Sequence, residues 1–304
     1  MAVDEAFTYA SDAGLNLHHL LYSEAWSLES AESGQPSKAQ PMPAGDLALR
    51  DAPGFQDAIA FYRAELIHRH LLFDQRLQEL SLWLIGRGGS APAGWDEVFT
   101  PLLADYLARD WADHDRHNNR WSSAVSAEMA KLLSGAVERL EQAYGRCLPD
   151  RPVLVSTVYV GDRLPAYTSL GPTHITCSTT HPESKGLTAA EIVLHEASHA
   201  LIGGLREAIR SKVDVAQPGL GQLWHVVLFF ITGQVVVRLL ADSGVAYTPY
   251  LESTGLFDRA WPHLRQPVTE ACTGYLDGRW DWDAACDRLA ATLNQRSVYE
   301  VPAR

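Results

Sequence analysis

Residues 195–199, His-Glu-Ala-Ser-His, place two imidazoles and one carboxylate at a spacing that suits metal chemistry. Two histidines four positions apart on a helix lie one turn apart on the same face, so both rings can converge on an ion such as Zn²⁺. Glu196 lies beside this face, where its carboxylate can take a proton from a metal-bound water. Polar groups on so apolar a helix are costly unless something pairs them, which favours a functional site over coincidence.

A third ligand is expected from the apolar helix predicted over Leu220–Leu240. This helix has no acidic residue, and its one strong ligand is His225, which is 225 − 199 = 26 residues after His199. A lone histidine on an apolar helix is more often a hydrogen-bonded core residue than a ligand. A two-histidine motif without a partner reverses that preference, so His195, His199 and His225 are the expected metal ligands.

Residue patterns indicate the elements that must position these ligands. The first half has helical periodicity and is interrupted by a segment rich in Pro, Gly and Ser at 31–53, which is expected to be a loop or linker. The helices are expected over Asp12–Ser30, Phe55–Ile85, Trp95–His117 and Asn119–Tyr144. His114 and His117 are expected at a solvated helix end.

The pattern changes after Pro149. Two β-branched runs, 151–162 and 166–180, predict two strands, and Thr188 with Glu191 forms a capping box that would start the HEASH helix. We therefore expect a mostly α protein with a small β-sheet, an α+β fold. An N-terminal helical domain would span 1–148, and a metal-binding catalytic domain would span 149–304.

Composition limits the classes of partner. The formal charge of −12 argues against nucleic acid and anionic membranes, which both need a basic surface. Asp4 and Glu5 stand where a secretory signal would carry basic residues, so we expect a cytoplasmic protein with reduced cysteines. The apolar run from Leu223 is interrupted by polar residues and indicates a buried helix. No GxGxxG, GxxxxGK[ST] or GxSxG motif supports nucleotide or serine-hydrolase chemistry.

In HEASH and in the order of elements over Val153–Leu240, the chain resembles the zincin metallopeptidases, and in particular the gluzincin-like arrangement. The resemblance implies an edge strand that binds extended substrate, here Gly171–Ser178, then the HExxH helix, then a helix that supplies the third ligand. Gluzincins use a glutamate there, and His225 stands in its place. The metzincin pattern HExxHxxGxxH is not present.

The resemblance also implies roles for further residues. A tyrosine downstream of the third ligand would stabilise the substrate oxyanion, which makes Tyr250 and Tyr247 candidates. His174 and Thr176 on the proposed edge strand, together with Trp224, are the expected substrate contacts. A carboxylate should orient the ligand imidazoles through their second nitrogen. The available carboxylates are those of Glu207, Asp214 and Asp242.

Three functions remain open. The first is a zinc peptidase or amidase that cleaves a peptide or an amide-containing small molecule. The second keeps the ligands but binds Fe²⁺, as in HExxH oxygenases that use 2-oxoglutarate, whose carboxylate Arg238 or Arg259 could hold. The third is a binding protein on a degenerate zincin, which the intact Glu196 argues against.

Overall fold

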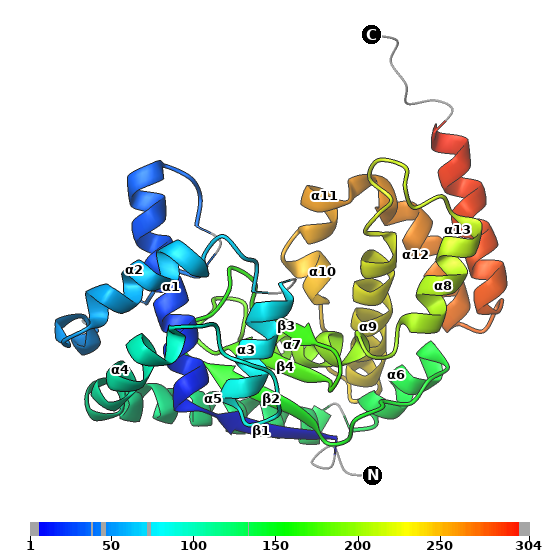
Figure 1. Ribbon diagram of the computed structural model, residues 1–304. Coiled ribbons are helices and arrows are strands. Elements are labelled where there is room, and N and C mark those ends of the chain that lie inside the picture. Colours follow the sequence, from blue (N-terminus) through cyan, green and yellow to red (C-terminus); the bar gives the residue numbers. More distant parts are fainter. Residues whose placement is uncertain (1–5, 38, 44–46, 72–73, 133, 298–304) are drawn as a thin grey trace, which may run out of the picture. The chain divides into compact units, whose positions relative to one another are not determined.

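The computed structural model describes residues 6–37, 39–43, 47–71, 74–132 and 134–297 (Figure 1). Contacts divide the chain into two compact units. One combines Asp4–Glu128 with Pro152–Val193, and the other combines Met1–Val3, Met129–Arg151 and Leu194–Arg304. We call them the sheet unit and the helical unit.

The sheet unit contains a four-stranded sheet in the order β1-β2-β4-β3. The strands are β1 (Phe7–Ser11), β2 (Val153–Val158), β3 (Ala166–Ser169) and β4 (His174–Ser178). β1, β2 and β4 are parallel, and β3 runs antiparallel to β4. Every residue of β2 is buried, as expected for a strand of a parallel sheet that is covered on both faces.

Helices cover both faces of this sheet. On one face His19 Nε2 of α1 lies 2.8 Å from the Tyr167 hydroxyl, and on the other Trp121 of α5 packs edge-on against Tyr9 at 6.4 Å between ring centroids. The helices are α1 (Ala13–Ser33), the short 3₁₀ helix η2 (Ala48–Asp51), α2 (Phe55–Glu65), α3 (Gln75–Leu84), α4 (Trp95–Arg109) and α5 (Trp111–Leu132). α5 crosses into the helical unit at its end.

The helical unit is built around α9 (Leu223–Asp242), which packs against α6, α8, α10 and α12 (Figure 1). The other helices are α6 (Ala136–Tyr144), α8 (Gly203–Lys212), α10 (Tyr250–Ser253), α11 (Leu256–Ala260), α12 (Pro262–Leu276) and α13 (Trp282–Ser297). Within the described residues, α9 alone is long and apolar enough to cross a membrane. Most of it is buried inside the structure, which is consistent with the core helix of a soluble protein.

The expected α+β composition is confirmed, because the structure is mostly helical with one small mixed sheet. The expected helix over Phe55–Ile85 is wrong: α2 ends at Glu65, and a new helix starts where the Asp74 carboxylate accepts a hydrogen bond from Arg76 N at 2.9 Å. The run 166–180 forms two strands, β3 and β4, joined by a turn in which Gly171 has φ +91°.

Three other expectations also differ from the structure. The two helices expected over Trp95–His117 and Asn119–Tyr144 are three, α4, α5 and α6. The first break is at Asp110, whose carboxylate accepts hydrogen bonds from the backbone of η2. In the expected linker 31–53, α1 continues to Ser33 and η2 is helical, while the other described residues are mostly irregular.

The units are divided differently from the domains expected at 148/149. β1, from the start of the chain, pairs with β2, so the strands group with the N-terminal helices. The helix that carries HEASH, α7 (Gly186–Ser198), begins in the sheet unit and ends in the helical unit. The helix begins at Gly186, two residues before Thr188. The capping box expected from Thr188 and Glu191 is therefore not at the start of the helix.

Candidate metal centre

The first two candidate ligands lie at the end of α7. His195 lies within the helix, whereas His199 follows its last residue, Ser198. Here the backbone tightens into i→i+3 hydrogen bonds, with His199 N donating to Glu196 O at 3.2 Å and Leu201 N to Ser198 O at 3.0 Å. The two rings still lie side by side, with centroids 5.1 Å apart.

The third histidine joins them from the first turn of α9. His225 Nε2 lies 3.3 Å from His195 Nε2, and one ring nitrogen from each of the three histidines lies within 4.8 Å of the others. In a tetrahedral site with Zn–N distances of about 2.0–2.1 Å, two ligand nitrogens are about 3.3–3.4 Å apart. The cluster therefore fits a metal ion, and all three ligands belong to the helical unit.

Hydrogen bonds between α7 and α9 fix this arrangement. The Thr232 hydroxyl of α9 lies 3.2 Å from the Ser198 hydroxyl at the end of α7, and 3.3 Å from the hydroxyl of Tyr144 on α6. All three side chains are buried. The contact lies about two helical turns from His225 along α9, so it sets where the α9 ligand meets the α7 ligands.

All three imidazoles are held in the neutral form that binds metals. Burial, then the neighbouring imidazoles, keeps the pKa of His195 well below 6.5. Burial, then the charge of Arg206, lowers the pKa of His199 to about 4. Burial, then His199, lowers the pKa of His225 to about 3. Each ring therefore keeps a free lone pair at neutral pH.

The Glu196 carboxylate lies close to the histidine cluster. Its side chain is on the same turn, and its Oε2 lies 3.8 Å from His199 Nε2. The residue is only 8% exposed. A buried carboxylate next to a three-histidine cluster can accept a proton from a group held at that cluster.

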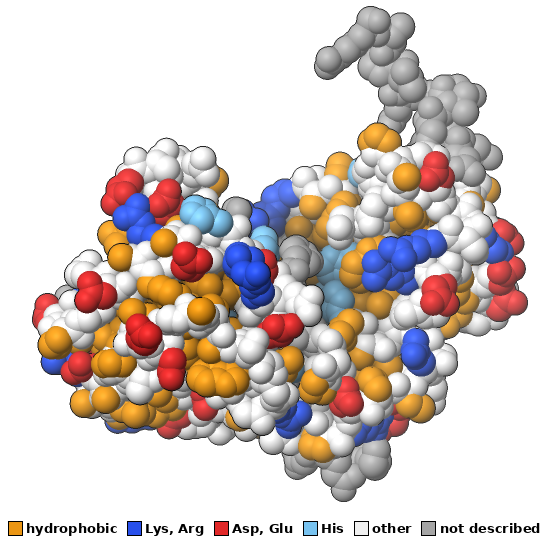
Figure 2. Space-filling view, viewed as in Figure 1, with side chains coloured by type: hydrophobic (Ala, Val, Ile, Leu, Met, Phe, Trp, Pro, Cys, Tyr) orange, Lys and Arg blue, Asp and Glu red, His pale blue; other side chains and the backbone are white. Residues whose placement is uncertain are grey.

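Aromatic rings surround the imidazoles. Phe229, one turn after His225, stacks on His195 at 3.8 Å and carries Tyr250 on its other side at 5.9 Å. Trp224 stacks on His225 at 5.0 Å. His199 and His225 are both half-buried, and Figure 2 shows histidine surface beside hydrophobic and Lys or Arg surface close to α9. The cluster is thus both accessible and lined by apolar rings.

The expected substrate strand is wrong. β4 lies between β2 and β3 and is not an edge strand. His174 and Thr176 belong to the sheet unit and are 0% and 1% exposed, so neither side chain presents a surface to substrate. His174 Nε2 is instead hydrogen-bonded to the Ser156 hydroxyl at 2.9 Å.

The tyrosines and arginines expected at the site lie in different environments. Tyr250 reaches the aromatic cluster through Phe229, and Tyr247 is half-buried between α9 and α10. Arg238 is bound by Asp277 at 2.6 Å and by Leu276 O at 2.8 Å, and Arg259 is exposed on α11.

The expected carboxylates do not orient His195. Its Nδ1 is buried and has no hydrogen-bond partner among the described residues. Asp242 pairs with Arg139, Asp214 accepts from the nearby Ala216 N, and Glu207 is exposed. The His195 ring is held by its stacking on Phe229, and none of these carboxylates accepts a hydrogen bond from its Nδ1.

Sequence reasoning missed Phe229, Trp261 and Arg206. Phe229 had a usable signal, since it lies four residues after His225 and so on the same helix face. Trp261 comes from the end of α11, with its ring 6.2 Å from that of His225, and Arg206 lies over Trp224. Nothing in their local sequence marks these two residues.

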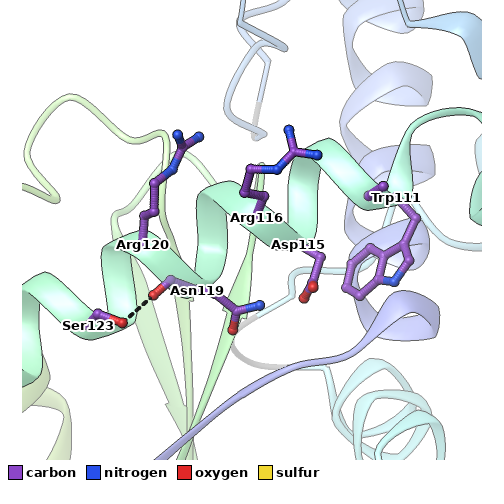
Figure 3. A pocket seen from close by; sticks show the side chains of 7 residues that line it. Trp111, Asp115, Arg116, Asn119, Arg120 and Ser123 are labelled. Atoms are coloured by element: carbon purple, nitrogen blue, oxygen red, sulfur yellow. Dashed lines mark hydrogen bonds between the residues drawn. The ribbon is translucent and has the colours of Figure 1, made fainter.

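A second surface, on α5, gives less support for a functional site than the histidine cluster does. Its shallow face is formed by one helix, and the side chains shown in Figure 3 are Trp111, Asp115, Arg116, Asn119, Arg120 and Ser123. The Ser123 hydroxyl donates to Asn119 O, and Arg116 pairs with Asp113, so these polar groups bond within their own helix.

The solvated helix end expected at His114 is wrong, because its ring is buried and stacks on Tyr159 at 3.9 Å between ring centroids.

Comparison with protein-family models, with curated proteins and with solved structures finds no match to this chain.

Proposed function

We propose that the protein is a metal-dependent hydrolase, with zinc as the metal and a peptide or an amide-containing small molecule as the substrate. The observation that carries this proposal is the convergence of His195, His199 and His225, with two Nε2 atoms 3.3 Å apart and the Glu196 carboxylate 3.8 Å from His199. The zincin resemblance of HEASH supports the same function.

Each residue has a role in such a reaction. His195, His199 and His225 would hold the zinc ion, which would supply Lewis-acid activation of a water and of a substrate carbonyl. Glu196 accepts the proton of the attacking water and passes it to the leaving amine. Phe229 holds the His195 ring by stacking, and Trp224 and Trp261 place apolar rings beside His225. Tyr250 is the candidate donor to the oxyanion.

The substitution Glu196→Gln tests this proposal. We expect metal content equal to that of the wild type and a loss of roughly 10²–10⁴-fold in chelator-sensitive cleavage of a mixed peptide library. Glu207→Gln, an exposed carboxylate on α8, is the matched control and should cleave normally. Full cleavage by a metal-loaded Glu196→Gln protein would contradict the proposed role.

The donor set also favours one alternative, an Fe²⁺ oxygenase that uses 2-oxoglutarate, because neutral imidazoles suit Fe²⁺ as well as Zn²⁺. Metal analysis of protein purified without oxygen separates the two. Stoichiometric iron would rule out the zinc hydrolase. The engagement of Arg238 by Asp277 leaves that residue unsuited to hold the co-substrate.

The free cysteines and the net charge support a cellular compartment and a class of substrate for the proposed enzyme. Cys147, Cys177, Cys272 and Cys286 are free, as in a reducing compartment. With the charge of −12, we place the enzyme in the cytoplasm, acting on a peptide or amide and not on nucleic acid or a membrane.

A further inference from the structure

Arg206 is a cation held next to two of the metal ligands. It lies in the first turn of α8, seven residues after His199, and its guanidinium carbon is 4.6 Å from the centre of the Trp224 ring. That ring stacks on His225 and meets His199 edge-on at 5.8 Å. One aromatic ring therefore separates the guanidinium from the ligand imidazoles.

This guanidinium has no anionic partner. Of the residues that the structure describes, none places a carboxylate oxygen within 4.0 Å of it, and its Nε is buried without a hydrogen-bond acceptor. Several arginines of the helical unit are paired with carboxylates, for example Arg139 with Asp242 and Arg265 with Glu252. The nearby Arg210 adds a second positive charge. The residue is half-buried, and its charge has no carboxylate beside it, so the N–H groups other than Nε–H are suited to an incoming anion.

The geometry specifies the kind of acceptor. The guanidinium carbon lies over the Trp224 ring, and a planar guanidinium presents an edge of N–H donors. That edge matches the two oxygens of a carboxylate. Because that ring contacts His199 and His225, a carboxylate bound to Arg206 would lie about one aromatic ring away from these two histidines.

We propose that Arg206 is a carboxylate-binding residue of the metal centre, so that the molecule acted on, or a co-substrate, carries a carboxylate. This inference builds on the proposed metal centre. Two sources share this chemistry: the C-terminal carboxylate of a peptide and a 2-oxo acid.

Calorimetry on the full-length protein, metal-free and zinc-loaded, tests the proposal with four probes: N-acetylglycine, its amide, 2-oxoglutarate and inorganic phosphate. We expect a carboxylate probe to bind, the amide not to bind, and Arg206→Gln to weaken binding roughly ten- to a hundredfold, the range for a charge-assisted hydrogen bond. Arg206→Lys should recover only part of the affinity, since it keeps the charge and loses the fork. Arg210→Gln, one turn further along α8, is the matched control and should bind within about twofold of wild type.

The probes also distinguish the sources. Preference for N-acetylglycine assigns a peptide C-terminus, and preference for 2-oxoglutarate assigns a 2-oxo acid. Equal binding by wild type and a folded Arg206→Gln, equal binding of the acid and its amide, or a preference for phosphate would each overturn the proposal. Zinc content measured on the same samples reports on the metal centre separately, so loss of zinc binding with retained carboxylate binding refutes only the proposed function.

Discussion

Replacing His225 by phenylalanine tests the metal centre at its third ligand. The substitution removes Nε2, which lies 3.3 Å from His195 Nε2, and keeps a ring that can stack on Trp224 and Phe229. Structural zinc sites are bound with about 10–16 kcal/mol, which is about 3 kcal/mol for each of four ligands. Loss of one ligand should therefore weaken zinc binding roughly a hundredfold.

The assay is competition for zinc against a chromophoric chelator, with unfolding in urea as a check of the fold. The metal-free variant should be as stable as the wild type, because a half-buried imidazole is replaced by an apolar ring of similar shape. His263→Phe, which changes a histidine whose ring contacts Gly219 O, is the control and should bind zinc normally. If a folded His225→Phe binds zinc within about threefold of the wild type, His225 is not a ligand and the reasoning fails.

Two further substitutions test the supporting structure. Thr232→Val removes the hydroxyl next to Ser198 and Tyr144. It should lower the free energy of unfolding in urea by about 1–2 kcal/mol and weaken zinc binding several-fold. Lower stability with unchanged zinc affinity would mean that this contact does not position the ligands. Burial raises the pKa of Asp162 from 3.8 to about 6. The fold therefore favours the protonated acid, and the stability it contributes is present below pH 3.8 and lost as the pH rises through about 6. Asp162→Asn should match the wild type near pH 4 and be about 2 kcal/mol more stable at pH 8, and a difference independent of pH would contradict this origin.

The sequence was most informative where chemistry and local geometry coincide. HEASH could be interpreted because helical spacing alone brings His195 and His199 together, and His225 could be selected because its helix offers no other strong ligand. Even there, the end of α7 was not evident: His199 lies beyond the helix, in a tightened turn.

Long-range pairing explains the failures. The position of β4 in the sheet depends on β3 folding back beside it and on β2 pairing with its other edge, and no local pattern in His174–Ser178 reveals either. β1 was missed for the same reason, since its partner β2 lies more than a hundred residues later. Arg206 meets Trp224 only through the packing of α8 against α9.

The orphaned nitrogen of His195 has a consequence for the tautomers of the centre. If His195 bound an ion through Nε2, its ring proton would have to be on Nδ1, which is buried and has no acceptor among the described residues. Without a metal, the same proton can sit on Nε2, between two imidazoles whose Nε2 atoms are 3.3 Å apart. Moving this proton from Nε2 to Nδ1 breaks the hydrogen bond between the two imidazoles and leaves the Nδ1 donor without an acceptor, which costs about 1–3 kcal/mol. We therefore expect an ion at this centre to be held roughly tenfold to a hundredfold less tightly than it would be if a carboxylate accepted from His195 Nδ1.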